Sequence, residues 1–399
     1  MSNTGFVQYH MRTVVQAAPG AIIRIPSLFE GLGASRVLLL SDTGLKDNGI
    51  VDQLISVFQT NSSGLNPALA GVFTDIATNS TCETINAAVK YMREVGADSI
   101  LAVGGGSVLD AAKGIKYAMH HKLSDIRTAL QGGIKLETWP DASPINIPHI
   151  AVPTTAGTGA EVSAAAVFYN EQLGIKCNLI APFIEADFAV LDANLTLGLP
   201  QRLTASTGID ALTHALEALA SPAANSFTDA HAMAAAQLIE QNLPVVVENG
   251  RNVQARHDML QASTMAINAF CNGLNAIPVH NCAHAFGALY HIPHGDANCV
   301  LLPLVIEALP EFYQPNAVRL AKALNLEVKG KSNETLLTEV IARLRLLQEQ
   351  IGGPTNFSAY EIPASDLTKI VTAVAMDPAG VFYPIPHERI AQIAEKAIS

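Results

Sequence analysis

The 399-residue sequence lacks several features that mark common classes of protein. Its cysteines form no C-x-x-C pair and are odd in number and widely spaced, which argues against a disulfide framework and a structural zinc knuckle; they are Cys82, Cys177, Cys271, Cys282 and Cys299. The first residues show no basic segment followed by an apolar one, and no apolar run reaches the ~18 residues of a membrane helix. We therefore expect no membrane partner and a reducing cytoplasm as the location.

Positive charge is also scarce. Lys and Arg number 24 against 35 Asp and Glu, so the formal net charge is -11. Nucleic acids are bound by clustered Lys and Arg, and none is expected as a partner. Hydrophobic residues make up 49% of the chain, which is enough for a large core and argues against disorder.

The first half of the chain alternates short apolar runs with helical patterns. Val37–Leu40, Ile100–Val103 and His149–Val152 each end at turn-forming or polar residues, and Cys82–Val95 has the spacing of an amphipathic helix. Buried strands that alternate with helices predict a parallel sheet covered on both faces.

The pattern changes near Asp192–Pro200, beyond which the strand signals fade. Helical spacing with abundant Ala and Leu predicts four helices, at Thr204–Ser221, Phe227–Leu243, Arg251–Asn268 and Thr335–Gln350. We place a domain boundary near residue 195, with an α/β domain over residues 1–195 and an all-helical domain over residues 196–399.

Two of the predicted strands lead into loops suited to phosphate. Gly104–Ser107 precedes a predicted helix at Leu109–Tyr117, whose N-terminal amides favour a pyrophosphate. Thr154–Gly159 offers hydroxyl groups directly after a strand. Neither loop is G-x-G-x-x-G or a Walker A motif, and each alone also fits a tight turn. Two such loops at neighbouring strand ends favour the binding of a dinucleotide.

Asp42 ends another predicted strand. A carboxylate there can accept hydrogen bonds from a ribose 2′-hydroxyl and repel a 2′-phosphate, which would select NAD over NADP. A turn or helix-capping aspartate is the alternative interpretation.

Histidines cluster in the second half. Four of the twelve fall within fifteen residues, at positions 280, 284, 291 and 294, and His280 and His284 share a helix face. Upstream, Asp210 and His214 have the same four-residue spacing among apolar neighbours. One carboxylate with several imidazoles suits Fe(II), Zn(II), Co(II) or Ni(II). A buried Asp–His ion pair beside a separate histidine-rich turn would explain the same spacing.

Four motifs together resemble the iron-containing alcohol dehydrogenase family. They are GGGSVLDAAK (104–113), PTTAGTGAEVS (153–163), TGIDALTHALEA (207–218) and VHNCAHAFGALYHIPHGDANCVLLP (279–303). The resemblance implies a dehydroquinate synthase-like architecture, with a Rossmann-like N-terminal domain, a helical C-terminal domain and an active site in the cleft between them.

The resemblance also assigns roles to residues of this chain. It implies a metal held by Asp210, His214, His280 and His294, and a proton-transfer role for His284. The positions that match cofactor contacts are Asp42, Asn79, Gly105, Gly106, Ser107, Thr154, Thr155, Thr158 and Lys176.

The expected reaction is hydride transfer between a small primary alcohol and NAD, with Fe(II), or alternatively Zn(II), as the Lewis acid. A homodimer or larger homo-oligomer is expected from the family. The alternatives are a glycerol dehydrogenase-like enzyme, a hydroxyacid or sugar-alcohol oxidase or transhydrogenase on the same scaffold, and a non-catalytic metal- or nucleotide-binding protein.

The sequence departs from the family pattern at three places. Ala160 replaces a serine in the second loop, Ile267 replaces a glycine before the histidine motif, and the stretch 271–279 is longer and contains Pro278. These changes lie near the expected metal and cofactor, so we expect an unusual substrate shape rather than a different reaction.

Overall fold

The computed structural model describes residues 7–60, 67–140 and 142–399. The described chain separates into two compact units. A sheet unit comprises residues 11–155 and 159–197, and a helical unit comprises residues 7–10, 156–158 and 198–399. The change of unit after Leu197 lies close to residue 195, whereas the sequence pattern gives no sign that the two short segments join the helical unit.

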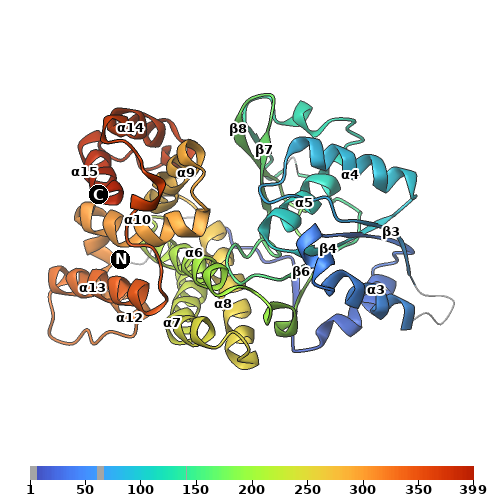
Figure 1. The fold of residues 1–399 in the computed structure, drawn as a ribbon, viewed down its shortest axis with the longest axis horizontal. Coiled ribbons are helices and arrows are strands. Elements are labelled where there is room, and N and C mark those ends of the chain that lie inside the picture. Colours follow the sequence, from blue (N-terminus) through green and yellow to red (C-terminus); the bar gives the residue numbers. More distant parts are fainter. Residues whose placement is uncertain (1–6, 61–66, 141) are drawn as a thin grey trace. The chain divides into compact units, whose positions relative to one another are not determined.

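The sheet unit is built on six parallel strands in the order β1-β9-β6-β4-β2-β3, of which Figure 1 labels β3, β4 and β6. Their bounds are β1 Val14–Ala17, β2 Arg36–Leu40, β3 Ala68–Phe73, β4 Ser99–Gly104, β6 His149–Pro153 and β9 Phe188–Leu191. The three predicted strands are confirmed as β2, β4 and β6, which lie side by side in the middle of the sheet. β3 lies on one side of β2 and β4 on the other, so the strand order reverses between β2 and β4, where ligands of open α/β sheets bind.

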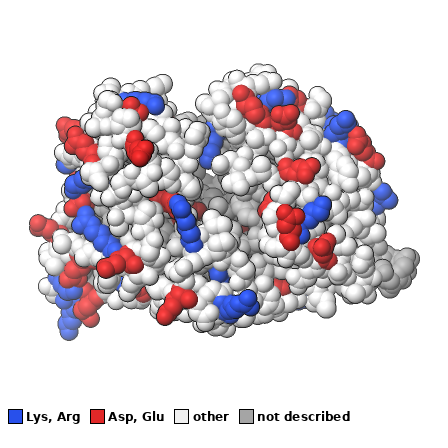
Figure 2. All heavy atoms as spheres, viewed as in Figure 1, with Lys and Arg blue, Asp and Glu red and all other residues white. Residues whose placement is uncertain are grey.

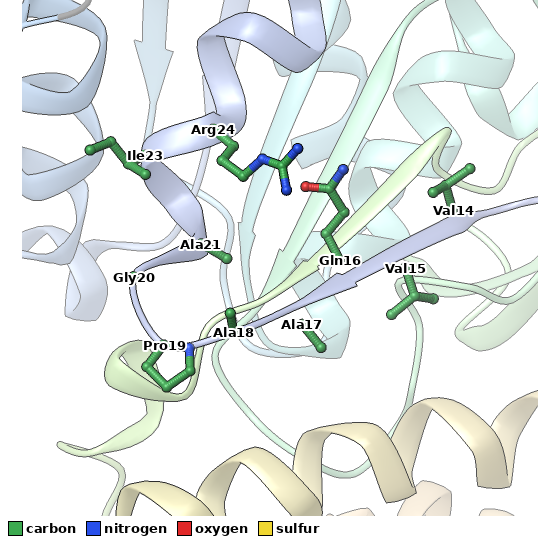
Figure 3. Close-up of a pocket in the computed structure, with 10 residues that line it drawn as sticks. All are labelled: Val14, Val15, Gln16, Ala17, Ala18, Pro19, Gly20, Ala21, Ile23 and Arg24. Atoms are coloured by element: carbon green, nitrogen blue, oxygen red, sulfur yellow. The ribbon is translucent and has the colours of Figure 1, made fainter.

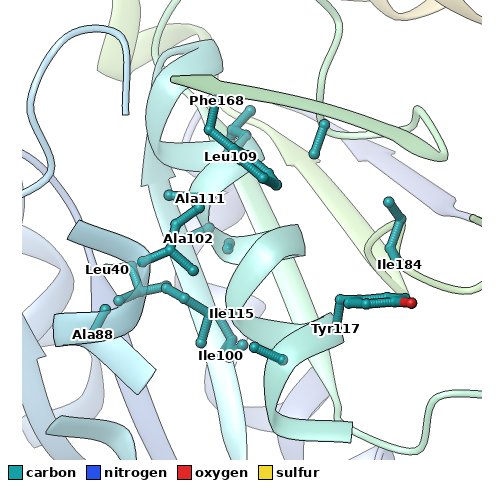
Figure 4. Packing of buried hydrophobic residues seen from close by; sticks show 14 of the residues in the cluster. Leu40, Ala88, Ile100, Ala102, Leu109, Ala111, Ile115, Tyr117, Phe168 and Ile184 are labelled. Atoms are coloured by element: carbon teal, nitrogen blue, oxygen red, sulfur yellow. The ribbon is translucent and has the colours of Figure 1, made fainter. Parts of the chain in front are cut away.

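Side chains of the central strands alternate between two cores. Leu38 and Leu40 belong to a cluster with α4 and α5 (Figure 4), whereas Val37 and Leu39 belong to a cluster with α1 and α3. The helices of this unit are α1 Ile25–Gly31, α2 Thr43–Asp47, α3 Ile50–Thr60, α4 Cys82–Glu94 and α5 Gly106–His120, with 3-10 turns η1 Ala21–Arg24, η2 Ile126–Ala129 and η3 Ala193–Thr196. The predicted covering of both faces is therefore confirmed.

A second sheet of three strands, which the sequence pattern does not indicate, packs against α5. It consists of β5 Ile134–Leu136, β7 Ala165–Asn170 and β8 Ile175–Ile180, with β7 and β8 antiparallel. Lys113 of α5 is buried and ties the two elements together, because its ammonium group donates to the carbonyl of Ala165, the first residue of β7, and to Ser163 Oγ just before that strand at 2.8 Å.

The helical unit begins with three long helices, α6, α7 and α8, that pack against one another (Figure 1). The predicted helices at the start of this half and at Thr335–Gln350 are confirmed as α6, α7, α8 and α13, and α7 continues past its predicted end through Pro244. The bounds are α6 Gln201–Ala220, α7 Ser226–Glu248, α8 Val253–Asn272, α9 Pro278–Tyr290, α10 His294–Ala308, α11 Pro310–Tyr313, α12 Ala317–Ala323, α13 Asn333–Gln350, α14 Leu367–Met376 and α15 His387–Ile398, with η4 Gln314–Asn316, η5 Ser358–Tyr360, η6 Ala364–Asp366 and η7 Pro378–Gly380.

An N-terminal segment, residues 7–10, belongs to this helical unit. The ring of Tyr9 stacks on Phe227 with centroids 5.0 Å apart, and its hydroxyl donates to Asn268 Oδ1 at 2.6 Å. The backbone of His10 exchanges two hydrogen bonds with the Asn272 amide, at 2.9 and 3.0 Å. These contacts fix the segment against α7 and α8.

The edge strand β1 and the turn after it line a hollow of about 490 Å³ over residues 14–24, toward which Gln16 and Arg24 point (Figure 3). The hollow contains none of the predicted site residues. On the face drawn in Figure 2, acidic and basic side chains are interspersed. Among the described residues, no helix has both the length and the apolar content needed to cross a lipid bilayer.

Candidate functional site

Three of the predicted metal ligands meet in the helical unit, each from a different helix. Asp210 comes from α6, His280 from α9 and His294 from the first residue of α10. His294 Nε2 lies 3.4 Å and His280 Nε2 lies 3.7 Å from Asp210 Oδ1. One ligand atom from each of the three lies within 4.8 Å of the others, the only such group of His, Cys, Asp and Glu found in the described part of the chain.

His214, the fourth predicted ligand, is adjacent to this group but not part of it. Its Nε2 lies 4.0 Å from Asp210 Oδ1, one helical turn away on α6. The imidazole ring stacks on that of His280, with centroids 4.7 Å apart and an interplanar angle of 15°. Its Nε2 therefore lies near the compact set but farther from Asp210 than the nitrogens of His280 and His294 do.

Burial and charge act together on these groups. Burial alone would raise the pKa of Asp210, but the neighbouring imidazoles outweigh it and hold that pKa well below its usual range. Burial lowers the pKa of His214 to about 4, although Asp210 opposes the shift. Burial also acts to lower the pKa of His280, but the carboxylates of Glu217 and Asp210 raise it to about 9. The site therefore favours an ionised Asp210 that attracts positive charge.

Close packing of α6 and α10 places His294 beside Asp210. A Cβ atom on Gly295 would overlap the carbonyl oxygen and the hydroxyl of Ser206 on α6. Only glycine permits this approach of the two backbones. One turn further along α10, Asn298 is fully buried and donates from its amide to Asp210 Oδ1 at 2.8 Å.

His284 lies one turn after His280 on α9, as its spacing predicts. Its ring centroid is 6.2 Å from that of His280 and 5.7 Å from that of His294. The side chain is 39% exposed, so it is open to solvent, and its Nδ1 lies 3.4 Å from Asp377 Oδ1. His284 thus lies between the group of ligand-type residues and solvent, a position suited to moving a proton.

Sequence reasoning missed four residues of this site. Glu217 lies seven residues after Asp210 on α6, and helical spacing alone would have placed it on the same face. Phe270 packs its ring on His214 and His280, with centroids 4.8 and 4.9 Å away. Asn298 and Asp377 gave no signal, because an asparagine in a helix and an aspartate 93 residues away are unremarkable in sequence.

In the sheet unit, the two predicted phosphate loops lie next to each other. They follow β4 and β6, whose ends pair through Gly104 and Pro153, and the Thr154 amide donates to the Gly104 carbonyl at 3.0 Å. A Cβ atom on Gly105 would lie 3.5 Å from Thr155 Oγ1. α5 begins at Gly106, so its N-terminal amides open beside both loops.

The strand ends on the other side of β4 contribute two more predicted residues. Asn79, in the loop after β3, has a positive φ of 58° and donates its backbone N–H to Ser107 Oγ at 3.1 Å. Asp42 follows β2, caps α2 and accepts from the Leu45 amide at 2.9 Å. Asp42 therefore caps a helix, as the alternative interpretation expected. The cap uses Oδ1, so the other carboxylate oxygen is not needed for capping.

The last two predicted cofactor residues lie apart from these loops in the chain. Lys176 is on β8, where it pairs with Tyr169 of β7. Thr158 is grouped with the helical unit, unlike Thr154 and Thr155. The structure thus brings together the residues that follow β3, β4 and β6 and places Asp42 just after the adjacent strand β2.

Comparison with known protein families identifies both units. Residues 13–193 match the family described as iron-containing alcohol dehydrogenase, and residues 204–398 match the C-terminal part of the Fe-containing alcohol dehydrogenase family. The chain belongs to the iron-containing alcohol dehydrogenase family. This confirms the resemblance drawn from the four motifs, the fold class and the assignment of the enzyme as an oxidoreductase of the alcohol dehydrogenase type.

Individual relatives agree with the family. The enzyme is 34% identical to long-chain-alcohol dehydrogenase 1 of Geobacillus thermodenitrificans, over 88% of this chain and 86% of the relative. It is 34% identical to 1,3-propanediol dehydrogenase of Klebsiella pneumoniae, over 87% of each. A crystal structure of a 1,3-propanediol oxidoreductase superposes with a TM-score of 0.89 at 32% identity, covering 98% of this chain and 100% of that one.

Proposed function

We propose that the enzyme is an NAD(H)-dependent, metal-dependent alcohol dehydrogenase and aldehyde reductase that acts on a small primary alcohol. The observation that carries the proposal is the meeting of three ligand-type residues from three helices, the buried Asp210 and His280 and the half-buried His294. His280 Nε2 is buried and has no hydrogen-bond partner among the described residues. A buried polar atom without a partner costs about 1–3 kcal/mol, and a cation bound by the neutral ring would remove that cost.

The donor set fits a divalent transition metal. Asp210, His280 and His294 provide the compact part of the set, and His214 is proposed as the fourth ligand. Carboxylate and imidazole donors suit Fe(II), and Zn(II) is the alternative that the same donors would accept. When bound, the metal supplies a Lewis acid that polarises the oxygen of the alcohol or aldehyde.

The loops of the sheet unit support nicotinamide binding. We assign the diphosphate to the amides at the start of α5 and to Gly105, Gly106, Ser107, Thr154 and Thr155. Asn79, Thr158 and Lys176 are proposed as further contacts.

Asp42, at the point where the strand order reverses, is proposed to accept from the adenosine ribose. Its negative charge would repel a 2′-phosphate, so NAD(H) is preferred to NADP(H).

His284 is proposed to move the proton of the reaction. Its exposed ring accepts the proton released from the alcohol and passes it to solvent, and Asp377 stabilises the imidazolium that forms. In aldehyde reduction the same two residues work in reverse.

Two further proposals concern the setting. All five cysteines are free, which suits a reducing cytoplasm. We also propose a homodimer or larger homo-oligomer, which sedimentation of the purified enzyme would test.

The deciding experiment measures NADH and NADPH oxidation over a panel of short aldehydes. The protein is first stripped by a chelator and then loaded anaerobically with Fe(II) or Zn(II). We expect activity only after metal is restored, and higher kcat/KM with NADH than with NADPH. Asp210→Asn should remain inactive, whereas Asp258→Asn should behave as wild type, because the hydrogen bond that Asp258 makes within the described part of the chain is with Gln254 on its own helix.

Four results would contradict parts of the proposal. Full activity of the chelated protein would exclude a catalytic metal. A preference for NADPH would exclude the proposed role of Asp42 in cofactor selection. Metal and NADH binding without reduction of any aldehyde would remove the substrate class, and oxygen uptake without added NAD would favour the oxidase alternative.

A further inference from the structure

We infer that Glu217 is a positioning residue that fixes the tautomer and the orientation of His280, an inference that rests on the proposed metal-dependent function. Glu217 lies on α6, seven residues after Asp210 and three after His214, so all three share one helix face. Its residue is 1% exposed, which makes it one of the most deeply buried carboxylates in the described chain.

Both carboxylate oxygens of Glu217 are used by α9. Oε1 accepts from the backbone N–H of Val279 at 2.7 Å, and Oε2 contacts His280 Nδ1. α9 begins at Pro278, and its N-cap residue Ile277 makes no side-chain capping bond. Glu217 therefore caps α9 from a neighbouring helix, where the helix dipole favours a negative charge.

The second contact sets the proton position on His280. An ionised carboxylate can only accept hydrogen bonds, so Nδ1 of His280 must carry the hydrogen. A cation binds the neutral ring, and in that form a hydrogen on Nδ1 leaves the lone pair on Nε2. That nitrogen is buried without a hydrogen-bond partner and lies 3.7 Å from Asp210 Oδ1. Glu217 thus leaves Nε2, which lies near Asp210, as the ring nitrogen that can bind a cation.

The other imidazoles near the site are held differently. The ring of His214 is fixed by stacking on His280 and by Phe270. His284 faces Asp377 at 3.4 Å, and its side chain is 39% exposed to water. The Glu217–His280 pair is wholly buried, so little water competes for the bond and the ring has a single orientation. Carboxylates that hold ligand imidazoles in this way typically contribute about 10- to 100-fold to metal affinity.

Glu217→Gln tests the assignment with little change in shape. Glutamine can still accept from the Val279 amide through its oxygen, but its NH₂ group cannot accept from His280 Nδ1–H. We expect the dissociation constant for Co(II), measured by chelator competition on the metal-free protein, to rise about 10- to 100-fold. The visible d–d spectrum of the Co(II) form should also shift, because the imidazole is no longer held in one orientation.

Two further variants separate positioning from a purely structural role. Glu217→Asp keeps the charge on a shorter side chain and should recover part of the affinity. Glu240→Gln is the matched control, because Glu240 pairs with Arg343 in the same helical unit and contacts none of the ligand-type residues. It should leave the dissociation constant and the spectrum unchanged.

The outcomes distinguish this inference from the proposed function. A wild-type protein that binds no Co(II) would overturn both. A folded Glu217→Gln protein with wild-type affinity and spectrum, even one with a lower melting temperature, would overturn the positioning role alone. If Glu217→Gln does not fold, a folded Glu217→Asp protein with wild-type affinity and spectrum would do the same.

Discussion

Buried Lys116 makes the stability of the sheet unit depend on pH, so that the free energy of unfolding is higher in alkaline solution. The side chain is fully buried in α5, and its ammonium group donates to the Glu185 carbonyl at 2.8 Å. Burial lowers the pKa of Lys116 to about 8, because nearby Asp187 and Glu185 only partly offset the loss of water. In the unfolded chain the same group titrates near its ordinary value of about 10.4.

The direction of the pH dependence follows from the fact that Lys116 binds its proton more tightly in the unfolded state than in the folded state. Below pH 8 both states are protonated, and the fold carries the full penalty of a buried charge. Between about pH 8 and pH 10.5 the folded state has lost its proton while the unfolded state still holds it, so the penalty is progressively relieved. A shift of this size corresponds to about 3 kcal/mol in the free energy of unfolding.

We predict that Lys116→Met removes this pH dependence. At pH 7 the variant gains about 3 kcal/mol from the absent charge and loses about 1 kcal/mol with the hydrogen bond to Glu185. The second contribution does not change with pH. The difference in unfolding free energy between variant and wild type should therefore fall by about 2–3 kcal/mol between pH 7 and pH 10.

The chain provides its own probe for this measurement. Trp139, its only tryptophan, belongs to the sheet unit and packs on Phe183 with ring centroids 5.4 Å apart. Urea titrations followed by tryptophan fluorescence at several pH values thus report on the unit that contains Lys116. Lys90→Met is the control, because the Lys90 side chain is 79% exposed, and it should change the free energy by less than about 0.5 kcal/mol at every pH. A constant difference between Lys116→Met and wild type from pH 7 to pH 10 would refute the reasoning.

Three other changes test the proposed site. His280→Ala should lower kcat/KM by about 100-fold or more and release metal, measured by elemental analysis; full activity in a metal-free variant would contradict the Lewis-acid role. Asp42→Gly should raise the ratio of NADPH to NADH activity by about 10- to 100-fold, since glycine costs little at a helix cap; an unchanged ratio would remove Asp42 from cofactor selection. Gly295→Ala should lower the free energy of unfolding by about 2 kcal/mol, because the added methyl group would overlap Ser206. It should also weaken metal binding through His294. Calorimetry measures the first effect and chelator competition the second, and a variant as stable as wild type would contradict the tight packing of α6 on α10.

Local patterns predicted the parts of the fold that depend on nearby residues. The apolar runs that became β2, β4 and β6 are buried on both faces and end in glycine or polar residues, so each strand carries its own signal. The spacing of Asp210 and His214, and of His280 and His284, placed each pair on one face of a helix, α6 and α9. Such features need no knowledge of the rest of the chain.

Features that depend on distant pairing were missed. β1 has four residues and exists because Val14 pairs with Phe188 of β9, which is also four residues long. The three-stranded sheet is anchored to α5 in part by Lys113, which donates to the Ala165 carbonyl of β7 and lies 52 residues away in the chain. The sequence identified His214 as a candidate ligand but could not show that its ring stacks on His280 or that its Nε2 lies just outside the compact set.

The N-terminal segment imposes an order on the folding of a newly made chain. Tyr9 finds its partners on α7 and α8, where Asn268 lies 259 residues further along the sequence. At about 5–20 residues per second, a ribosome needs roughly 10–50 s to make the intervening chain. During that interval every residue of the sheet unit has been synthesised, because the unit ends at Leu197. The sheet unit can therefore form its core on the ribosome before α7 and α8, the partners of residues 7–10, have been completed.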